Sequence, residues 1–247
     1  MTEPFRWKNY YADVASSSYG DMAQSYLSDV VEPTLAALEK RISELRELSQ
    51  HDDLAVFALD PAEELLRTTM MGYCLAIQSL WEKQIRGYLQ RAAREFAPNT
   101  RLSERVQTAT WDSLGTIFND LRGVPLTAFD EFADLNMLRL LGNVCRHGDG
   151  PSMQRLAAEH PELWPTKPEP ELVPPLPGSS LEPVRTADSV TVSLDLLRKF
   201  ASAIDSFWRE TEYIYNESID RKHPSLEARL VEERRLRAGG GRPWDPP

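Results

Sequence analysis

The residues best suited to chemistry lie in one stretch, DLNMLRLLGNVCRHGDG, at positions 134–150. In a helix each residue turns by about 100°, which places the apolar side chains of this stretch on one arc. The other arc carries the polar residues Asn136, Arg139, Asn143 and His147, with Arg146 at its edge. Histidine can exchange a proton near neutral pH, and arginine can hold a phosphate or stabilise a charged transition state. The polar row is therefore our candidate catalytic site.

A structural interpretation of the same residues stays open. His147 precedes Gly148, and basic residues in a last turn before glycine are an ordinary helix ending. Arg139 alone is more often a solvated charge than a ligand. Asn143 favours the functional interpretation, because asparagine has low helix propensity and has no capping role in the middle of a helix.

The elements that position this row are predicted to be helices. Apolar residues recur every three or four positions, which indicates helices over 34–50, 61–96, 103–123, 127–147 and 194–216, with a short helix after Pro151. Pro61 suits a first helical turn with Asp60 as its cap. The middle of 61–96 is apolar on more than one face, which favours a central helix or one that also contacts a partner.

We therefore predict an all-α fold, an antiparallel helical bundle over 21–216. Residues 1–20 are expected to form an N-terminal arm. Residues 161–189 form a Pro-rich connection before the last long helix, because proline fixes φ and lacks an amide hydrogen. Residues 217–247 are expected to be a polar, weakly ordered tail with a charged helical stretch over 226–237.

The composition and the absence of known motifs exclude several classes of function. No apolar run is long enough to cross a bilayer, and we expect no secretory signal and no membrane partner. The two cysteines, Cys74 and Cys145, are expected to be buried thiols in the reducing cytoplasm. A metal at His51, Asp52 and Asp53 is improbable, and no nucleotide-loop, zinc-protease or other cofactor motif is present, so we expect neither metal nor cofactor. The net charge of −10 confines any nucleic-acid contact to a local basic patch.

The run N-V-C-R-H-G-D-G, late in a helix and followed by an irregular insert and another long helix, resembles the HEPN superfamily. The motif of that family is an arginine, four to six residues, and a histidine, often with asparagine directly after the arginine. Asn143 and His147 match the asparagine and the histidine. Gly142 occupies the usual place of the arginine, and Arg139 and Arg146 flank the same row.

The resemblance implies a helical homodimer of a prokaryotic defence or toxin–antitoxin system, with an antitoxin or defence protein as partner. It also implies a metal-independent endoribonuclease whose RNA-cutting cleft forms between two protomers. His147 would then act on the 2′-hydroxyl or the leaving oxygen, and Arg139 or Arg146 would stabilise the phosphorane. The alternative is a non-catalytic interaction module that has lost the arginine, as Gly142 and the acidic charge suggest.

Overall fold

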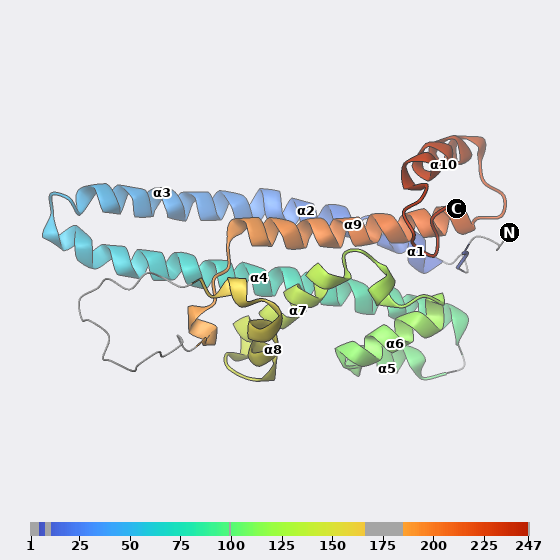
Figure 1. Cartoon of the computed structure of the whole chain (residues 1–247), viewed down its shortest axis with the longest axis horizontal. Coiled ribbons are helices and arrows are strands. Elements are labelled where there is room, and N and C mark those ends of the chain that lie inside the picture. Colours follow the sequence, from blue (N-terminus) through green and yellow to red (C-terminus); the bar gives the residue numbers. More distant parts are fainter. Residues whose placement is uncertain (1–4, 8–10, 99, 166–184, 247) are drawn as a thin grey trace. The chain divides into compact units, whose positions relative to one another are not determined.

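The structure is a computed structural model that describes residues 5–7, 11–98, 100–165 and 185–246. Every regular element in these ranges is a helix, and none of the described residues lies in a strand (Figure 1). The prediction of an all-α chain is confirmed. No helix among the described residues has the length and apolar character needed to span a membrane.

The chain divides into two compact units, each assembled from segments that are far apart in sequence. The first unit comprises Met1–Tyr26, Ser79–Leu135 and Lys199–Pro247. The second comprises Leu27–Gln78 and Asn136–Arg198. The division falls inside three helices, α4 (Asp53–Phe96), α7 (Phe132–His147) and α9 (Leu194–Ser218).

The first unit is built around aromatic side chains. Its elements are α1 (Tyr11–Ser16), α2 (Tyr19–Tyr26), α5 (Leu102–Thr108), α6 (Trp111–Arg122), η2 (Leu126–Ala128), α10 (Pro224–Arg237) and its parts of α4, α7 and α9. The Trp81 ring lies 4.9 Å from the Phe207 ring in an edge contact, and Phe129 lies 4.7 Å from Phe207. Edge and tilted contacts at these distances are favourable for aromatic pairs.

The predicted helix over 103–123 is instead two helices, α5 and α6. Ala109 and Thr110 are extended, and the Thr110 side chain accepts a hydrogen bond from the Ser113 amide at the start of α6. A threonine in this position caps a new helix by satisfying one of its free amides. Gly123, with φ of 76°, ends α6 in the left-handed region, as the sequence predicted.

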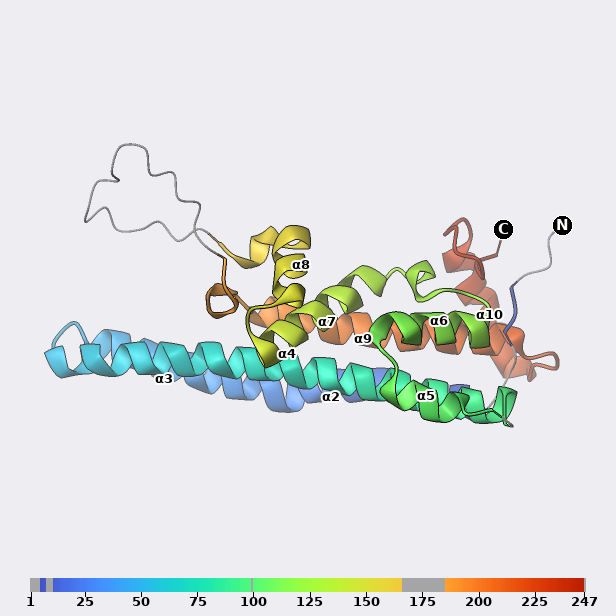
Figure 2. The same ribbon diagram turned by 90° about the horizontal axis from the view of Figure 1, so that it is seen from below.

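The second unit contains a helical hairpin formed by α3 (Glu32–Leu48) and the beginning of α4. The two helices run next to each other in Figure 1 and overlap in the perpendicular view of Figure 2. One turn of π-helix, η1 (Leu27–Val31), precedes α3. The rest of the unit holds α8 (Pro151–Glu159), η3 (Pro161–Leu163), η4 (Ala187–Ser189) and its parts of α7 and α9. Leu35 and Ile42 of α3 are buried, and Arg46 pairs with Glu63 of α4 at 2.6 Å.

The start of α4 differs from the prediction. The helix begins at Asp53 rather than Pro61, and Pro61 lies inside it. The Asp52 carboxylate accepts a hydrogen bond from the Leu54 amide, which provides an earlier cap. Ala55 and Ala62 are both buried, so the apolar period continues across the proline.

Both ends of the chain hold more structure than an arm and a weakly ordered tail. Helix α1 and the beginning of α2 lie within 1–20, and α10 covers the predicted charged stretch over 226–237. Arg234 binds Glu217, and Arg237 binds Glu210, both at 2.6 Å. Beyond α10, the buried Trp244 donates a hydrogen bond to Glu210. Of the Pro-rich connection, residues 166–184 lie outside the described residues.

Candidate functional site

The predicted polar row lies on the part of α7 that belongs to the second unit. Helix α7 ends at His147, and Gly148 adopts φ of 70° while its amide donates to the Val144 carbonyl at 2.9 Å. A left-handed glycine after a basic last turn is an ordinary way to end a helix. The structural interpretation of His147 therefore accounts for its position.

Three members of the row, Asn136, Arg139 and Asn143, are half-buried and hydrogen-bonded within the second unit. The Arg139 guanidinium donates through Nε and Nη2 to Asn136 Oδ1, at 3.2 and 2.8 Å. The Asn143 amide donates to the Ser152 hydroxyl of α8 at 3.4 Å. Asn143 thus has a structural partner on α8, which the helix pattern of α7 alone does not reveal.

Gly142, in the place of the family arginine, lies where α7 meets α4. A Cβ atom added at this glycine would lie 2.6 Å from Cγ and 2.8 Å from Cβ of Gln78. Both atoms belong to the inner part of a buried side chain, so neither can move away without displacing α4. The contact leaves no space for a side chain at position 142.

Arg146 binds the same glutamine. Its Nη2 donates to Gln78 Oε1 at 3.2 Å, although the residue as a whole is exposed. The side chain of Gln78 therefore meets α7 twice, through its methylene groups at Gly142 and through its amide oxygen at Arg146. The sequence pattern does not reveal this contact, because Gln78 and Arg146 are 68 residues apart in the chain.

The His147 side chain is exposed, and it forms no hydrogen bond or ion pair with any other described residue. Catalytic histidines are usually oriented by a further group that binds the second ring nitrogen. Within the described part of this chain, the structure brings Arg139, Asn143, Arg146 and His147 to one side of α7 but supplies no such group.

Cys74 of α4 and Cys145 of α7 interact on the side of α7 that carries its apolar residues. Cys74 is buried, whereas Cys145 is only half-buried, which corrects the expectation of two buried thiols. A hydrogen bond between the two side chains, together with burial, raises the pKa of Cys74 well above its usual range. The same hydrogen bond lowers the pKa of Cys145. Apolar patterns place both cysteines on helix faces that point inward, but they do not show that the two meet.

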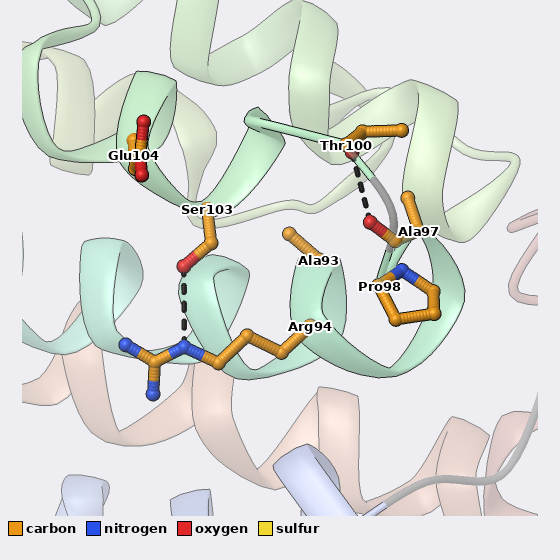
Figure 3. Close-up of a pocket in the computed structure, with 7 residues that line it drawn as sticks. All are labelled: Ala93, Arg94, Ala97, Pro98, Thr100, Ser103 and Glu104. Carbon is orange, nitrogen blue, oxygen red and sulfur yellow. Dashed lines mark hydrogen bonds between the residues drawn. The ribbon is translucent and has the colours of Figure 1, made fainter.

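A pocket of about 320 Å³ lies wholly within the first unit (Figure 3). Its lining residues are Ala93, Arg94, Ala97, Pro98, Thr100, Ser103 and Glu104. Arg94 Nε donates to the Ser103 hydroxyl at 3.2 Å. The charged groups of its lining are the exposed side chains of Arg94 and Glu104, and the pocket contains no histidine or cysteine. Among the described residues, no group of three histidine, cysteine or acidic side chains converges to hold a metal ion.

Comparisons with protein-family models, with curated proteins and with solved structures found no match to this chain. The function must therefore be argued from the geometry of the chain itself.

Proposed function

We propose that this protein is a non-catalytic helical interaction module that resembles HEPN proteins. The observation that carries this proposal is the contact between Gly142 and Gln78. In the family motif the arginine directly precedes the asparagine, and here that position is filled by the packing of α4 against α7. An arginine side chain would have to force the two helices apart, so the position serves helix packing rather than catalysis.

Three other residues of the row, Arg139, Asn143 and Arg146, form hydrogen bonds within the second unit. Arg139 binds Asn136, and Arg146 binds Gln78. Asn143 links α7 to α8 through Ser152. Each of these bonds holds a polar side chain in a position that supports the second unit, and His147 has no orienting partner within the described chain. This distribution supports a scaffold.

The cellular setting is part of the proposal. We infer a cytoplasmic homodimer in a prokaryotic defence or toxin–antitoxin system, where the module contacts an antitoxin or another defence protein. The net charge of −10 supports a protein partner over a nucleic acid, because an acidic surface repels phosphate backbones.

A metal-independent endoribonuclease is the second candidate, and one observation favours it. Arg146 and His147 are both exposed in the last turn of α7, where RNA or a second chain can reach them. In that mechanism His147 moves a proton at the 2′-hydroxyl or the leaving oxygen. The guanidinium of Arg146 or Arg139 stabilises the negative charge of the phosphorane.

An RNA cleavage assay separates the two candidates. The purified full chain is incubated over a range of protein concentrations with mixed cellular RNA and EDTA, beside His147→Ala. We expect no cleavage above the buffer control from either protein. Cleavage by the wild type that falls by about 10²–10⁴-fold in His147→Ala would establish the ribonuclease and reject the interaction module. Equal cleavage by both proteins would come from a contaminant and would leave His147 without a catalytic role.

A further inference from the structure

The beginning of α4 exposes large apolar side chains at helical spacing. Leu54, Phe57 and Leu65 have exposed fractions of 75%, 78% and 47%. At about 100° per residue the three lie within an arc of about 80°, and at about 1.5 Å per residue they span about 16 Å of the helix. Pro61, which is also exposed, lies in the same arc. We call these four residues the α4 stripe.

The stripe is not required for the packing of the α3–α4 hairpin. Ala55 and Ala62 are buried on a different arc of α4, and Glu63 reaches Arg46 of α3. Single exposed apolar residues are common on protein surfaces. An aromatic and two leucines aligned along one face of a helix, by contrast, are typical of a surface that binds another protein.

Charge around the stripe indicates what binds there. From Asp52 to Glu64 the sequence contains five carboxylates and no lysine or arginine (DDLAVFALDPAEE). Two of the five are ion-paired, Glu63 with Arg46 and Glu64 with Arg67. Asp60 has no ion pair among the described residues. The stripe is therefore apolar with an acidic border.

We propose that the α4 stripe binds a basic amphipathic helix of a partner protein. Apolar residues of that helix, spaced three and four apart, would cover Leu54, Phe57 and Leu65, and flanking lysines or arginines would meet the acidic border. This inference rests on the proposed function, because it names the chemistry of the partner that the module contacts.

The acidic border of the α4 stripe disfavours two other binding partners, a second copy of this chain and an anionic membrane. A second copy of this chain, paired antiparallel about Pro61, would bring Asp60 and Glu64 of each chain close to those of the other. Like charges brought together in this way are unfavourable at an interface. An anionic membrane would repel the same carboxylates. A basic helix covers the apolar side chains and meets the carboxylates with opposite charge.

Binding of a designed peptide to the full-length protein tests this inference. The probe is an 18-residue peptide of leucine and lysine, with the leucines spaced to form one helical face. Its affinity is measured by fluorescence anisotropy for the wild type, for Phe57→Ser and for Leu236→Ser. Leu236 on α10 is 71% exposed and lies in the other unit, which makes it a matched control. A second peptide replaces every lysine with glutamine.

We expect Phe57→Ser to weaken binding of the lysine peptide by about tenfold or more, and Leu236→Ser to leave it unchanged. The glutamine peptide should bind more weakly than the lysine peptide, and added salt should reduce that difference. Equal binding by both variants, or by both peptides, would overturn the inference. So would a dimer, or adhesion to anionic vesicles, that Phe57→Ser abolishes.

The two experiments can reject the non-catalytic function and the α4 stripe independently of each other. Cleavage that depends on His147, together with binding that depends on Phe57, would reject the non-catalytic function and keep the α4 stripe as a docking surface. Absence of cleavage with peptide binding that is indifferent to Phe57 would reject the stripe alone.

Discussion

The thiols of Cys74 and Cys145, the two cysteines of the second unit, differ in pKa. The hydrogen bond between them lowers the pKa of Cys145 and, with burial, raises that of Cys74. The thiolate attacks the carbon of an alkylating reagent and displaces its halide, so the labelling rate depends on the pKa and the exposure of the thiol. Cys145 has the advantage in both respects, because it is half-buried while Cys74 is buried.

Iodoacetamide should therefore label Cys145 before Cys74 in the folded protein. Because the pKa of Cys145 is lowered, its labelling rate should rise at lower pH than that of Cys74, whose thiolate appears only at higher pH. Mass spectrometry of digested protein, sampled over time at several pH values, measures both rates. Labelling of Cys74 first, or at the same pH, would contradict the assigned hydrogen bond, and labelling after denaturation should remove the difference.

The candidate site could be predicted only in part from the sequence. Helical spacing correctly indicated which polar side chains share one side of α7, because the 100° turn per residue is a local property. The partners of those side chains were not predictable, since Ser152 and Gln78 reach α7 from other helices. Asn143 was assigned to function for lack of a local role, and its structural role is the hydrogen bond to Ser152.

The crossing of α4 and α7 depends on a glycine at position 142. Gly142→Ala should lower the free energy of unfolding by about 1–3 kcal/mol, because the new Cβ meets Gln78 at less than 3 Å. Gly72→Ala on α4 is the matched control, since a Cβ there meets nothing within 4 Å. It should stabilise the protein by up to about 1 kcal/mol through helix propensity alone. Urea unfolding of both variants measures the two changes, and a neutral Gly142→Ala would show that the helices separate easily.

The segment after α10 should contribute strongly to stability. Trp244 is 3% exposed and its ring lies 4.8 Å from that of Phe129, so Trp244→Ala should cost about 3–5 kcal/mol. Leu236→Ala, at an exposed position of α10, should change stability by less than about 0.5 kcal/mol. Thermal unfolding followed by circular dichroism compares the two. Similar melting temperatures for both variants would indicate a tail that does not pack on the first unit.

The ends of helices could be predicted where one residue type stops a helix locally. The predictions were wrong where two sequence features favour different boundaries. Gly123 and Gly148 ended α6 and α7 as predicted, because a left-handed glycine is a local stop. Pro61 predicts a helix start. In the structure Asp52 caps the helix earlier, and the buried Ala55 and Ala62 continue the apolar face of α4 on both sides of the proline. The tail composition is polar. Its order in the structure comes from the burial of Leu230 and Trp244 and from ion pairs with α9, which no local pattern predicts.

For the molecule as a whole, the all-α class follows from the sequence because each amphipathic helix must bury one face. The division into two units does not follow, since each unit joins segments that are distant in sequence. Packing between these distant segments decides which faces of α4, α7 and α9 are buried. The function could not be predicted from the sequence for the same reason. The close contact of Gly142 with α4 is visible only in the folded chain.

Gly142→Arg tests the central claim most directly, because it restores the arginine of the family motif beside Asn143 and His147. RNA cleavage in EDTA is measured for this variant beside the wild type and the double variant with His147→Ala, with the melting temperature of each as the control for folding. We predict no cleavage by any of the three, and a lower melting temperature for both arginine variants. Cleavage by a stably folded Gly142→Arg that disappears in the double variant would contradict the account and reveal a dormant ribonuclease.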